Sequence, residues 1–375
     1  MKSEKIQLSK TIMVQPDNKV QGNFVEIDGE KFYRIEHYDL MPDFFMTIVS
    51  DSDQWMFISS NGSLTAGRKD RDHAIFPYYT DDKIHDYYDL TGSKTMILVQ
   101  KSDHTFLWQP FSKELAAVYR IERHLFKSIY GNKIIFRERN LDLEMEFQYG
   151  WFTSDNFGFV KKSGIVNLGA EPVTVSILDG LRNILPAGVD YNFQNAYSNL
   201  LDGYKKSELI EETRLGLFML SSIPVDKAEP SESLNATTVW SSGLDDCRIL
   251  ISDKQIGGFK SGSRLQTETD IRASRGAYFI NAEISLPVKE AKEWFFVCEV
   301  DQCTADVANL NHLLRSGSNL PEMVLSDIKE GTGRLVSYVA HADGLQTSND
   351  ELCTARHFSN VLFNIMSGGV FVHNY

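Results

Sequence analysis

A short polar stretch interrupts the apolar first part of the chain. Residues 67–73 read GRKDRDH, seven positions without an apolar side chain, between the runs QWMFIS and AIFPYY. A loop held between two rigid strands is a common way to present binding groups. Guanidinium, carboxylate and aromatic groups together can hydrogen-bond and stack on a sugar, and the planar guanidinium also suits phosphate. The predicted sugar contacts are Arg68, Asp70, Arg71, Asp72 and Tyr78.

The same stretch has a plainer interpretation. A loop of alternating positive and negative residues is usually a solvated turn or a surface cluster of ion pairs. Inverting cleavage of a glycosidic bond needs an acid and, opposite it, a water or phosphate nucleophile. Carboxylates are plentiful at positions 70, 72, 81, 82 and 86, but a complete catalytic pair is not expected among them. We therefore predict no catalytic residue in this chain.

Metal and cofactor sites are not predicted either. The nine histidines have no metal-ligand spacing. The four cysteines match neither a zinc nor a disulfide framework and are expected to be free thiols; they are Cys247, Cys298, Cys303 and Cys353. No glycine-rich loop opens a helix, so a nucleotide site is not expected.

Several aromatic and polar residues have two interpretations each. All five tryptophans lie within apolar runs, where core packing is favoured over sugar stacking; they are Trp55, Trp108, Trp151, Trp240 and Trp294. The tyrosines that follow the polar stretch are better candidates for sugar contact; they are Tyr78, Tyr79, Tyr87 and Tyr88. Asp179, Arg182 and Asn183 follow an apolar run, and a structural turn network is favoured there over a functional loop.

Composition narrows the class of protein. The chain has 375 residues, of which 42% are hydrophobic and 24% charged, with a formal net charge of −13. Acidic and basic residues are interspersed and form no basic stripe, which argues against nucleic acid as a partner. The start is polar and lacks the apolar core of a signal peptide, and no run is long enough to cross a membrane. We expect a cytoplasmic protein.

From residue 20 to about residue 300 the sequence reads almost wholly as β-strands. Asp28-Gly29 lies between two apolar runs, which is a strong hairpin signal. From Phe136 to Phe147 apolar and charged residues largely alternate, which predicts antiparallel strands with one buried face. More than ten such strands exceed what one open sheet usually holds. Residues 1–302 are therefore predicted to form a large antiparallel β-sandwich, with a short helix or long loop inserted near residues 191–212.

The pattern becomes helical from Cys303 to the end of the chain. Val307, Leu310 and Leu314 recur at helical spacing, and Pro321 suits the first turn of a second helix. Ser348 and Glu351 fit a capping box before a third helix with a wide apolar face. That face and the final VFVHNY predict a packing partner. We expect a C-terminal domain beyond residue 375; docking on the β domain or on a second subunit is the alternative.

One segment carries a family resemblance. Residues 46–86 contain Ser59-Ser60-Asn61-Gly62, a polar loop, Phe76-Pro77-Tyr78 and Asp81-Asp82, and Trp108-Gln109-Pro110 follows. This order resembles the N-terminal domain of the cellobiose and chitobiose phosphorylases, glycoside hydrolase family 94. The motif match covers about 70 residues, and the remainder, including ILDGLRNILPAG at 177–188, departs from the familiar members.

The resemblance implies a mainly β fold, a galactose mutarotase-like β-supersandwich followed by a short helical linker, residues 303–375. It implies that the catalytic acid and phosphate site lie in an α/α-barrel further along, with inorganic phosphate as co-substrate of the parent enzyme. This chain would then brace that barrel, form one wall of a site for a disaccharide or oligosaccharide, and take part in a homodimer. A free-standing carbohydrate-binding or mutarotase-like β-sandwich, and a purely structural interaction domain, are the alternatives.

Overall fold

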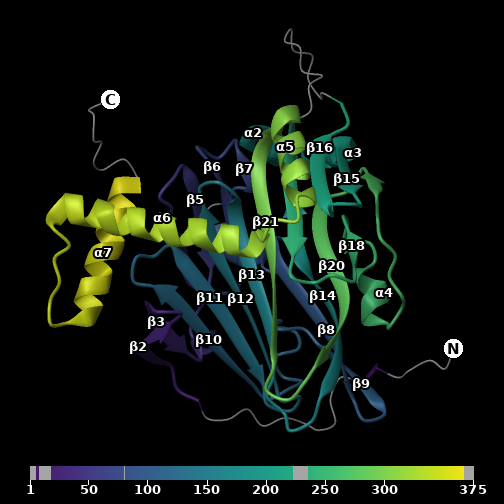
Figure 1. Ribbon diagram of the computed structural model, residues 1–375, viewed down its shortest axis with the longest axis horizontal. Helices are drawn as coiled ribbons and strands as arrows, with labels where there is room; N and C mark the ends of the chain where they lie inside the picture. Colours follow the sequence, from purple (N-terminus) through teal and green to yellow (C-terminus); the bar gives the residue numbers. More distant parts are fainter. Residues whose placement is uncertain (1–5, 8–17, 80, 223–234, 367–375) are drawn as a thin grey trace.

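The computed structural model describes residues 6–7, 18–79, 81–222 and 235–366, and its architecture is mainly antiparallel β. Three sheets of eleven, six and four strands form two facing layers (Figure 1). The eleven-stranded sheet is one layer, and the six- and four-stranded sheets lie side by side as the other. The predicted large antiparallel β-sandwich followed by helices is confirmed.

The eleven-stranded sheet is antiparallel throughout. In spatial order its strands are β19 (Asp270–Arg272), β15 (Lys205–Ile210), β16 (Leu215–Leu220), β17 (Asn235–Ser242), β21 (Ala291–Cys303), β13 (Gly158–Asn167), β12 (Met145–Ser154), β11 (Lys133–Asn140), β10 (Ile121–Ser128), β3 (Glu30–Glu36) and β2 (Gln21–Ile27). Most neighbours in the sheet are also neighbours in sequence, as expected of hairpin-built β structure.

The opposing layer contains two smaller sheets. The six-stranded sheet has β1 (Ile6–Gln7), β9 (His104–Trp108), β8 (Gly92–Lys101), β14 (Val173–Ile184), β20 (Gly276–Leu286) and β18 (Cys247–Leu250). The four-stranded sheet has β4 (Phe45–Ile48), β5 (Gln54–Ser59), β6 (Leu64–Arg68) and β7 (Ala74–Phe76). Only the β1–β9 pairing among the described strands is parallel.

The helices are short except at the C-terminal end. They are α1 (Asp81–Ile84), α2 (Tyr191–Ala196), α3 (Ser198–Tyr204), α4 (Ile256–Lys260), α5 (Thr304–Arg315), α6 (Leu320–Asp343) and α7 (Glu351–Met366), with 3-10 turns at Tyr38–Leu40 and His85–Tyr87. The insertion predicted near residues 191–212 contains α2 and α3, and β15 follows at once. Among these helices none is both long and apolar enough to cross a membrane.

Local sequence explains the turns. Asp28 and Gly29 both have positive φ, 50° and 78°, and join β2 to β3 as the hairpin signal predicted. The alternation from Phe136 to Phe147 is not one strand, however. The side-chain oxygen of Asn140 accepts hydrogen bonds from the backbone N–H groups of Asp142 and Leu143, which turns the chain between β11 and β12.

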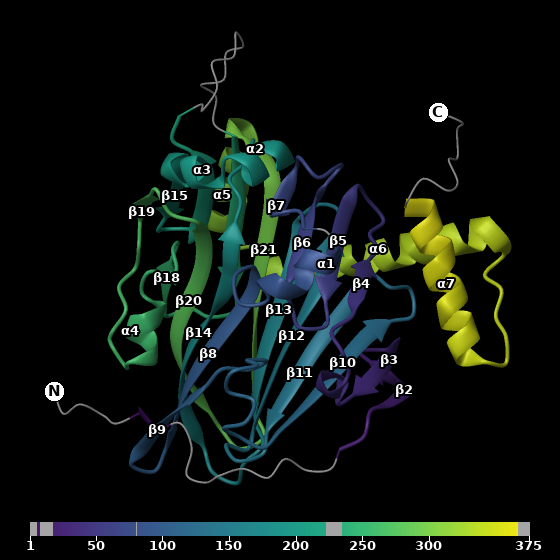
Figure 2. The ribbon, with the colours of Figure 1, turned by 180° about the vertical axis from the view of Figure 1, so that it is seen from behind.

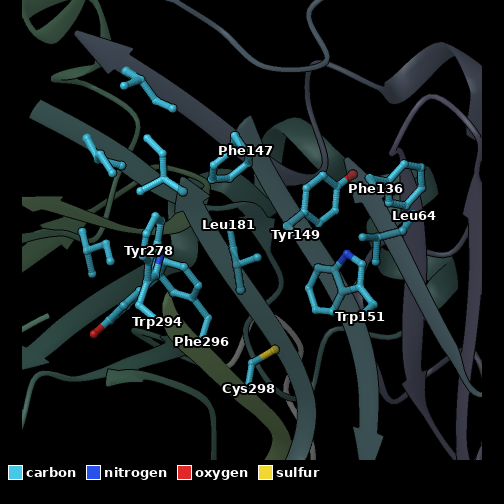
Figure 3. Packing of buried hydrophobic residues seen from close by; sticks show 14 of the residues in the cluster. Leu64, Phe136, Phe147, Tyr149, Trp151, Leu181, Tyr278, Trp294, Phe296 and Cys298 are labelled. Atoms are coloured by element: carbon cyan, nitrogen blue, oxygen red, sulfur yellow. The ribbon is translucent and has the colours of Figure 1, made fainter. Parts of the chain in front are cut away.

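The main core fills the space between the layers (Figure 3). Trp151 and Trp294 are fully buried there with Phe147, Phe296 and Tyr278. Trp108 and Trp240 are buried as well, so the core interpretation holds for four of the five tryptophans. Trp55 is the exception, because it lies on the outer face of the four-stranded sheet and is only partly buried.

A buried ion pair links the two layers. Lys161 of β13 donates from Nζ to Asp179 Oδ1 of β14 at 2.6 Å, and neither side chain is exposed. Trp294 Nε1 donates to Asp179 Oδ2 at 2.8 Å, and Thr95 Oγ1 donates to Asp179 Oδ1 at 2.6 Å. The Lys161 ammonium also lies 4.8 Å from the centre of the Phe296 ring. Burial lowers the pKa of Lys161, and the negative charge of Asp179 opposes that shift.

A second buried cluster, centred on Glu138, has the same arrangement of polar side chains. Glu138 of β11 accepts from Trp108 Nε1 of β9 at 2.7 Å and from Arg123 Nε of β10 at 2.7 Å. Arg123 and Glu138 are almost completely buried. In both groups a carboxylate holds a tryptophan N–H and a cation, so the buried charges have partners.

Helices α5 and α6 pack on the outer face of the eleven-stranded sheet (Figure 1). Val324 and Ile328 of α6 lie against Val160 and Phe295. Asp327 accepts hydrogen bonds from the Ser154 hydroxyl and from the Asn156 side chain and backbone. These contacts hold α6 on the sheet. Helix α5 is also attached to the sheet, because it begins directly after β21.

Helix α7 has a different cap from the one predicted, and its cover includes the β domain, which was the alternative to a further domain. Asp350, not Ser348, is the N-cap, because its Oδ1 accepts from the N–H groups of Leu352 and Cys353. Phe358 and Leu362 are buried against α6 and Val49, whereas Phe363 is exposed. Part of the apolar face is thus covered from within the chain. The final VFVHNY lies outside the described residues.

The Lys161–Asp179 pair gives the first prediction. Lys161→Met leaves the carboxylate of Asp179 buried without its cation, and this should lower the free energy of unfolding by about 3–5 kcal/mol. The matched control is Lys162→Met, one residue along β13, whose partner Glu293 is 45% exposed; it should cost no more than about 1 kcal/mol. Urea unfolding measures both. Equal losses in the two variants would contradict a special role for the buried pair.

The pKa of His124 predicts how the free energy of unfolding changes at acidic pH. Burial, and secondarily His37 at a ring distance of 5.4 Å, lowers the pKa of His124 from 6.5 to about 4. The unfolded chain therefore binds this proton first, so stability is complete above pH 6.5 and falls as the pH approaches 4, by up to about 3 kcal/mol. His124→Leu should flatten this part of the curve of unfolding free energy against pH, and exposed His104→Leu should leave it unchanged. Parallel curves for wild type and His124→Leu would refute the assignment.

Candidate functional site

Aromatic rings line the outer face of the four-stranded sheet. On β5 the side chains of Met56 and Ile58 are buried in the core, and those of Trp55 and Phe57 point the other way. Trp55 is paired across the sheet with Gly67 of β6. A Cβ at Gly67 would lie 2.6 Å from the Trp55 ring, so glycine lets the indole lie across the strand. This close approach explains why position 67 is a glycine.

The turn after Gly67 is built around Asp70. Lys69 has a positive φ of 58°, and the carbonyl of Asp70 accepts from Trp55 Nε1 at 3.1 Å. Asp70 Oδ1 accepts from the Asp72 N–H at 2.9 Å and lies 2.8 Å from His73 Nδ1. The His73 contact, first among several hydrogen bonds, lowers the pKa of Asp70. Asp70 is thus an ionised acceptor that shapes the turn.

Helix α2 packs against this turn (Figure 2). Asp72 Oδ1 accepts from the backbone N–H of Tyr191 at 2.9 Å, at the first residue of the helix. The Arg71 guanidinium lies 4.4 Å from the centre of the Tyr191 ring. Tyr78 lies edge-on to both Tyr191 and Trp55, with centroids 5.7 Å apart in each case. Arg71, Asp72 and Tyr78 are therefore brought together, with a helix that sequence reasoning did not connect to them.

The rings continue across the sheet. Phe57 lies 6.0 Å from Trp55 and 5.4 Å from Phe45, which is 41% exposed. We call the set the aromatic platform; its members are Phe45, Phe57, Trp55, Tyr78 and Tyr191. Arg71 and Asp72 are exposed at its α2 end. In the platform Phe45 is exposed and the other four rings are half-buried, with charged groups at one end.

Arg68 does not belong to the aromatic platform. It is the last residue of β6 and not a loop residue, and its guanidinium is occupied by acidic neighbours. It donates to both oxygens of Glu299 at 2.8 and 2.6 Å, to Asp53 at 2.6 Å and to the Asp155 carbonyl at 2.9 Å. These bonds join the four-stranded sheet to β21 of the facing sheet. Of the five predicted sugar contacts, Arg68 has the clearest structural role.

The other residues singled out by type have structural partners. Tyr79 and Tyr87 stack at 4.0 Å, and the Lys113 ammonium lies 5.2 Å from the Tyr88 ring. Asp179 lies in the core, so it belongs to no turn. Arg182 and Asn183 are also in β14, where a bulge gives Asn183 a φ of 59° and its amide donates to Thr91 at 2.9 Å. The interpretation as a turn is wrong, since β14 continues to Ile184.

Sequence reasoning missed four members of the platform: Phe45 and Phe57, which lie in apolar runs, and Trp55 and Tyr191. Trp55 was assigned to the core because QWMFIS is apolar, although the alternation of buried and exposed positions along β5 puts it outside. Tyr191 lies 119 positions from Asp72, and no local signal connects them. The four polar groups that remain available, Arg71, Asp72, Tyr78 and Tyr191, can hydrogen-bond hydroxyls beside aromatic faces. Among the described residues, no group of three or more potential ligands could hold a metal ion.

Comparison with known proteins leaves the family open. No family model matches the chain, and no curated protein matches it. Solved structures that resemble it include a bacterial glucoamylase in complex with acarbose, at 11% identity and a TM-score of 0.42, covering 92% of this chain and 42% of that one. A protein described as a kojibiose phosphorylase from the human microbiome has 8% identity and a TM-score of 0.33, covering 88% and 37%. Heparinase III has 10% identity and a TM-score of 0.32, covering 70% and 35%. The chain thus spans about two fifths or less of these proteins.

The contact between the turn and α2 gives a prediction. Asp72→Ala removes the acceptor for the Tyr191 N–H and should lower the free energy of unfolding by about 1 kcal/mol, the usual net value of a hydrogen bond. The control is Lys69→Asn in the same turn, because asparagine tolerates positive φ; it should change stability by no more than about 0.5 kcal/mol. Amide exchange of residues 191–196 should also accelerate in Asp72→Ala only. Unchanged exchange there would show that α2 does not depend on the turn.

Proposed function

We propose that this chain binds an oligosaccharide along the aromatic platform and is not itself catalytic. The observation that carries the proposal is the meeting of Trp55, Tyr78 and Tyr191 with exposed Arg71 and Asp72. Aromatic faces pack against the apolar faces of sugar rings, and the guanidinium and carboxylate groups exchange hydrogen bonds with hydroxyls. A row of rings suits several linked sugar units better than one.

The surface of α6 supports a second part of the proposal. Met323 and Leu325 of this helix are 40% and 44% exposed, although α6 is otherwise anchored through Val324, Asp327 and Ile328. Exposed apolar side chains beside a docked helix face suit a protein contact. We propose that this surface braces a catalytic α/α-barrel of a glycoside phosphorylase or hydrolase, of the family 94 type or a related one, or forms a homodimer. A free-standing carbohydrate-binding sandwich is the alternative.

Binding of oligosaccharides tests the platform. Wild-type protein should bind at least one of maltoheptaose, cellohexaose, chitohexaose or xylohexaose in calorimetric titration. Arg71→Ala and Tyr191→Ala should each weaken that binding roughly tenfold, about 1.4 kcal/mol, because each removes one side of the guanidinium–ring contact. Tyr197→Ala is the matched control, since Tyr197 is 58% exposed next to α2 and outside the platform.

Three results would each contradict a part of the proposed function. Equal affinities in Arg71→Ala, Tyr191→Ala and wild type would exclude the platform as the binding surface. Binding of none of the four sugars would overturn this proposed function. Turnover of any sugar by the purified chain, abolished by one Asp→Asn change within it, would overturn the non-catalytic assignment.

A further inference from the structure

A hollow lies between the two sheet layers where α7 covers their open edge. It has a volume of about 400 Å³, within the range of small-molecule sites. Its floor is continuous with the core, because Met46 of β4 and Leu125 of β10 belong to both. Ile35, Phe44 and Leu352 extend the apolar wall. Helix α7 closes one side because Phe358 and Leu362 anchor it to α6, while Leu352 and Ala355 face the hollow.

Lys127 enters this apolar space from β10. Residues 123, 125 and 127 of the strand share the face that points between the layers, and Leu125 is buried in the core there. A Cβ at Gly131 would lie 3.7 Å from Lys127 Cε and 3.9 Å from Ser359 Oγ, so the lysine runs beside the β10–β11 turn toward α7. Within the described part of the chain, its ammonium has neither an ion pair nor a hydrogen bond, which is unusual for a partly buried lysine.

The charges around the hollow are of one sign. Arg356 of α7 also lines it, and none of the residues in its lining is acidic. Burial alone lowers the pKa of Lys127 to about 8. A partly buried cation without a counter-ion is stabilised by an anion that enters the same space. The other polar side chains of the wall, those of Tyr33, Ser128, Ser359 and Asn360, carry no formal charge, so the two cations are the charged groups of the lining.

We propose that this hollow binds an amphipathic carboxylate, with its apolar chain between the sheet layers and its anionic head at Lys127 and Arg356. The mixture of branched, thioether and aromatic side chains in the wall fits a flexible aliphatic chain. This site is distinct from the aromatic platform and does not depend on the proposed sugar binding. Binding of a medium-chain fatty acid or a similar acid in the hollow would stabilise the packing of α7 against the sheets.

Titration with decanoate and with decanol tests the site. Wild type should bind decanoate at least tenfold more tightly than decanol. Lys127→Met, which keeps the length of the side chain but removes its charge, should abolish that preference, and Lys127→Arg should keep it within threefold. Ala355→Trp should fill the hollow and block both ligands. Lys254→Met is the control, because Lys254 is an exposed lysine on another surface.

Lysine acetylation followed by mass spectrometry gives an independent readout. At pH 8 decanoate should protect Lys127 at least fivefold and leave Lys254 unprotected. Decanoate binding that Lys127→Met leaves unchanged, or equal labelling of Lys127 with and without decanoate, would overturn the proposal. A concentration-dependent dimer that Ala355→Trp dissociates, with no binding of decanoate, would instead assign the hollow to a second copy of the chain and would equally overturn it.

Discussion

The Lys161–Asp179 pair is the constraint on which the arrangement of the two layers depends. Lys161 belongs to the eleven-stranded sheet and Asp179 to the six-stranded sheet, and both are completely buried. A charge in such a place is tolerated only with its counter-charge and hydrogen bonds in good geometry. Trp294 and Thr95 supply those bonds from opposite layers. Any slip of β13 or β14 by one residue would turn one of the two charges away from the other.

The same requirement recurs at Glu138, which holds Trp108 and Arg123. Two polar groups of this kind fix the relative register of sheets whose apolar contacts alone are non-directional. The aromatic platform and the hollow beneath α7 both lie away from these two buried groups, at the four-stranded sheet. The four-stranded sheet presents the aromatic platform on its outer face, and its β4 edge forms one wall of the hollow beneath α7. Arg68 then joins this small sheet to β21 through Glu299.

Both proposed sites combine apolar area with a few charged groups, but they suit different ligands. The platform lies on an outer face, and Arg71 and Asp72 offer donors and acceptors to solvent-exposed hydroxyls. The hollow is recessed, and its lining contains positive groups without acidic ones. On the two proposals, an oligosaccharide and a single-headed acid would therefore occupy different surfaces and would not compete.

The sequence by itself determined much of the local structure, although not the N-cap of α7 or the course of β14. The Asp28-Gly29 hairpin, the many antiparallel strands, the change to helices at Thr304 and the polar turn beyond Gly67 all follow from spacing over a few residues, where periodicity and turn chemistry act. Only the tertiary structure decided which strands face each other. A charged residue within a strand normally indicates a solvent-facing side, yet Lys161 and Asp179 are buried because both side chains point between the layers, where they pair. Trp55 is on the surface although its run is apolar, and Tyr191 reaches Asp72 across 119 positions. Such contacts depend on the order of strands within a sheet and the register between sheets, and no short stretch of sequence specifies either.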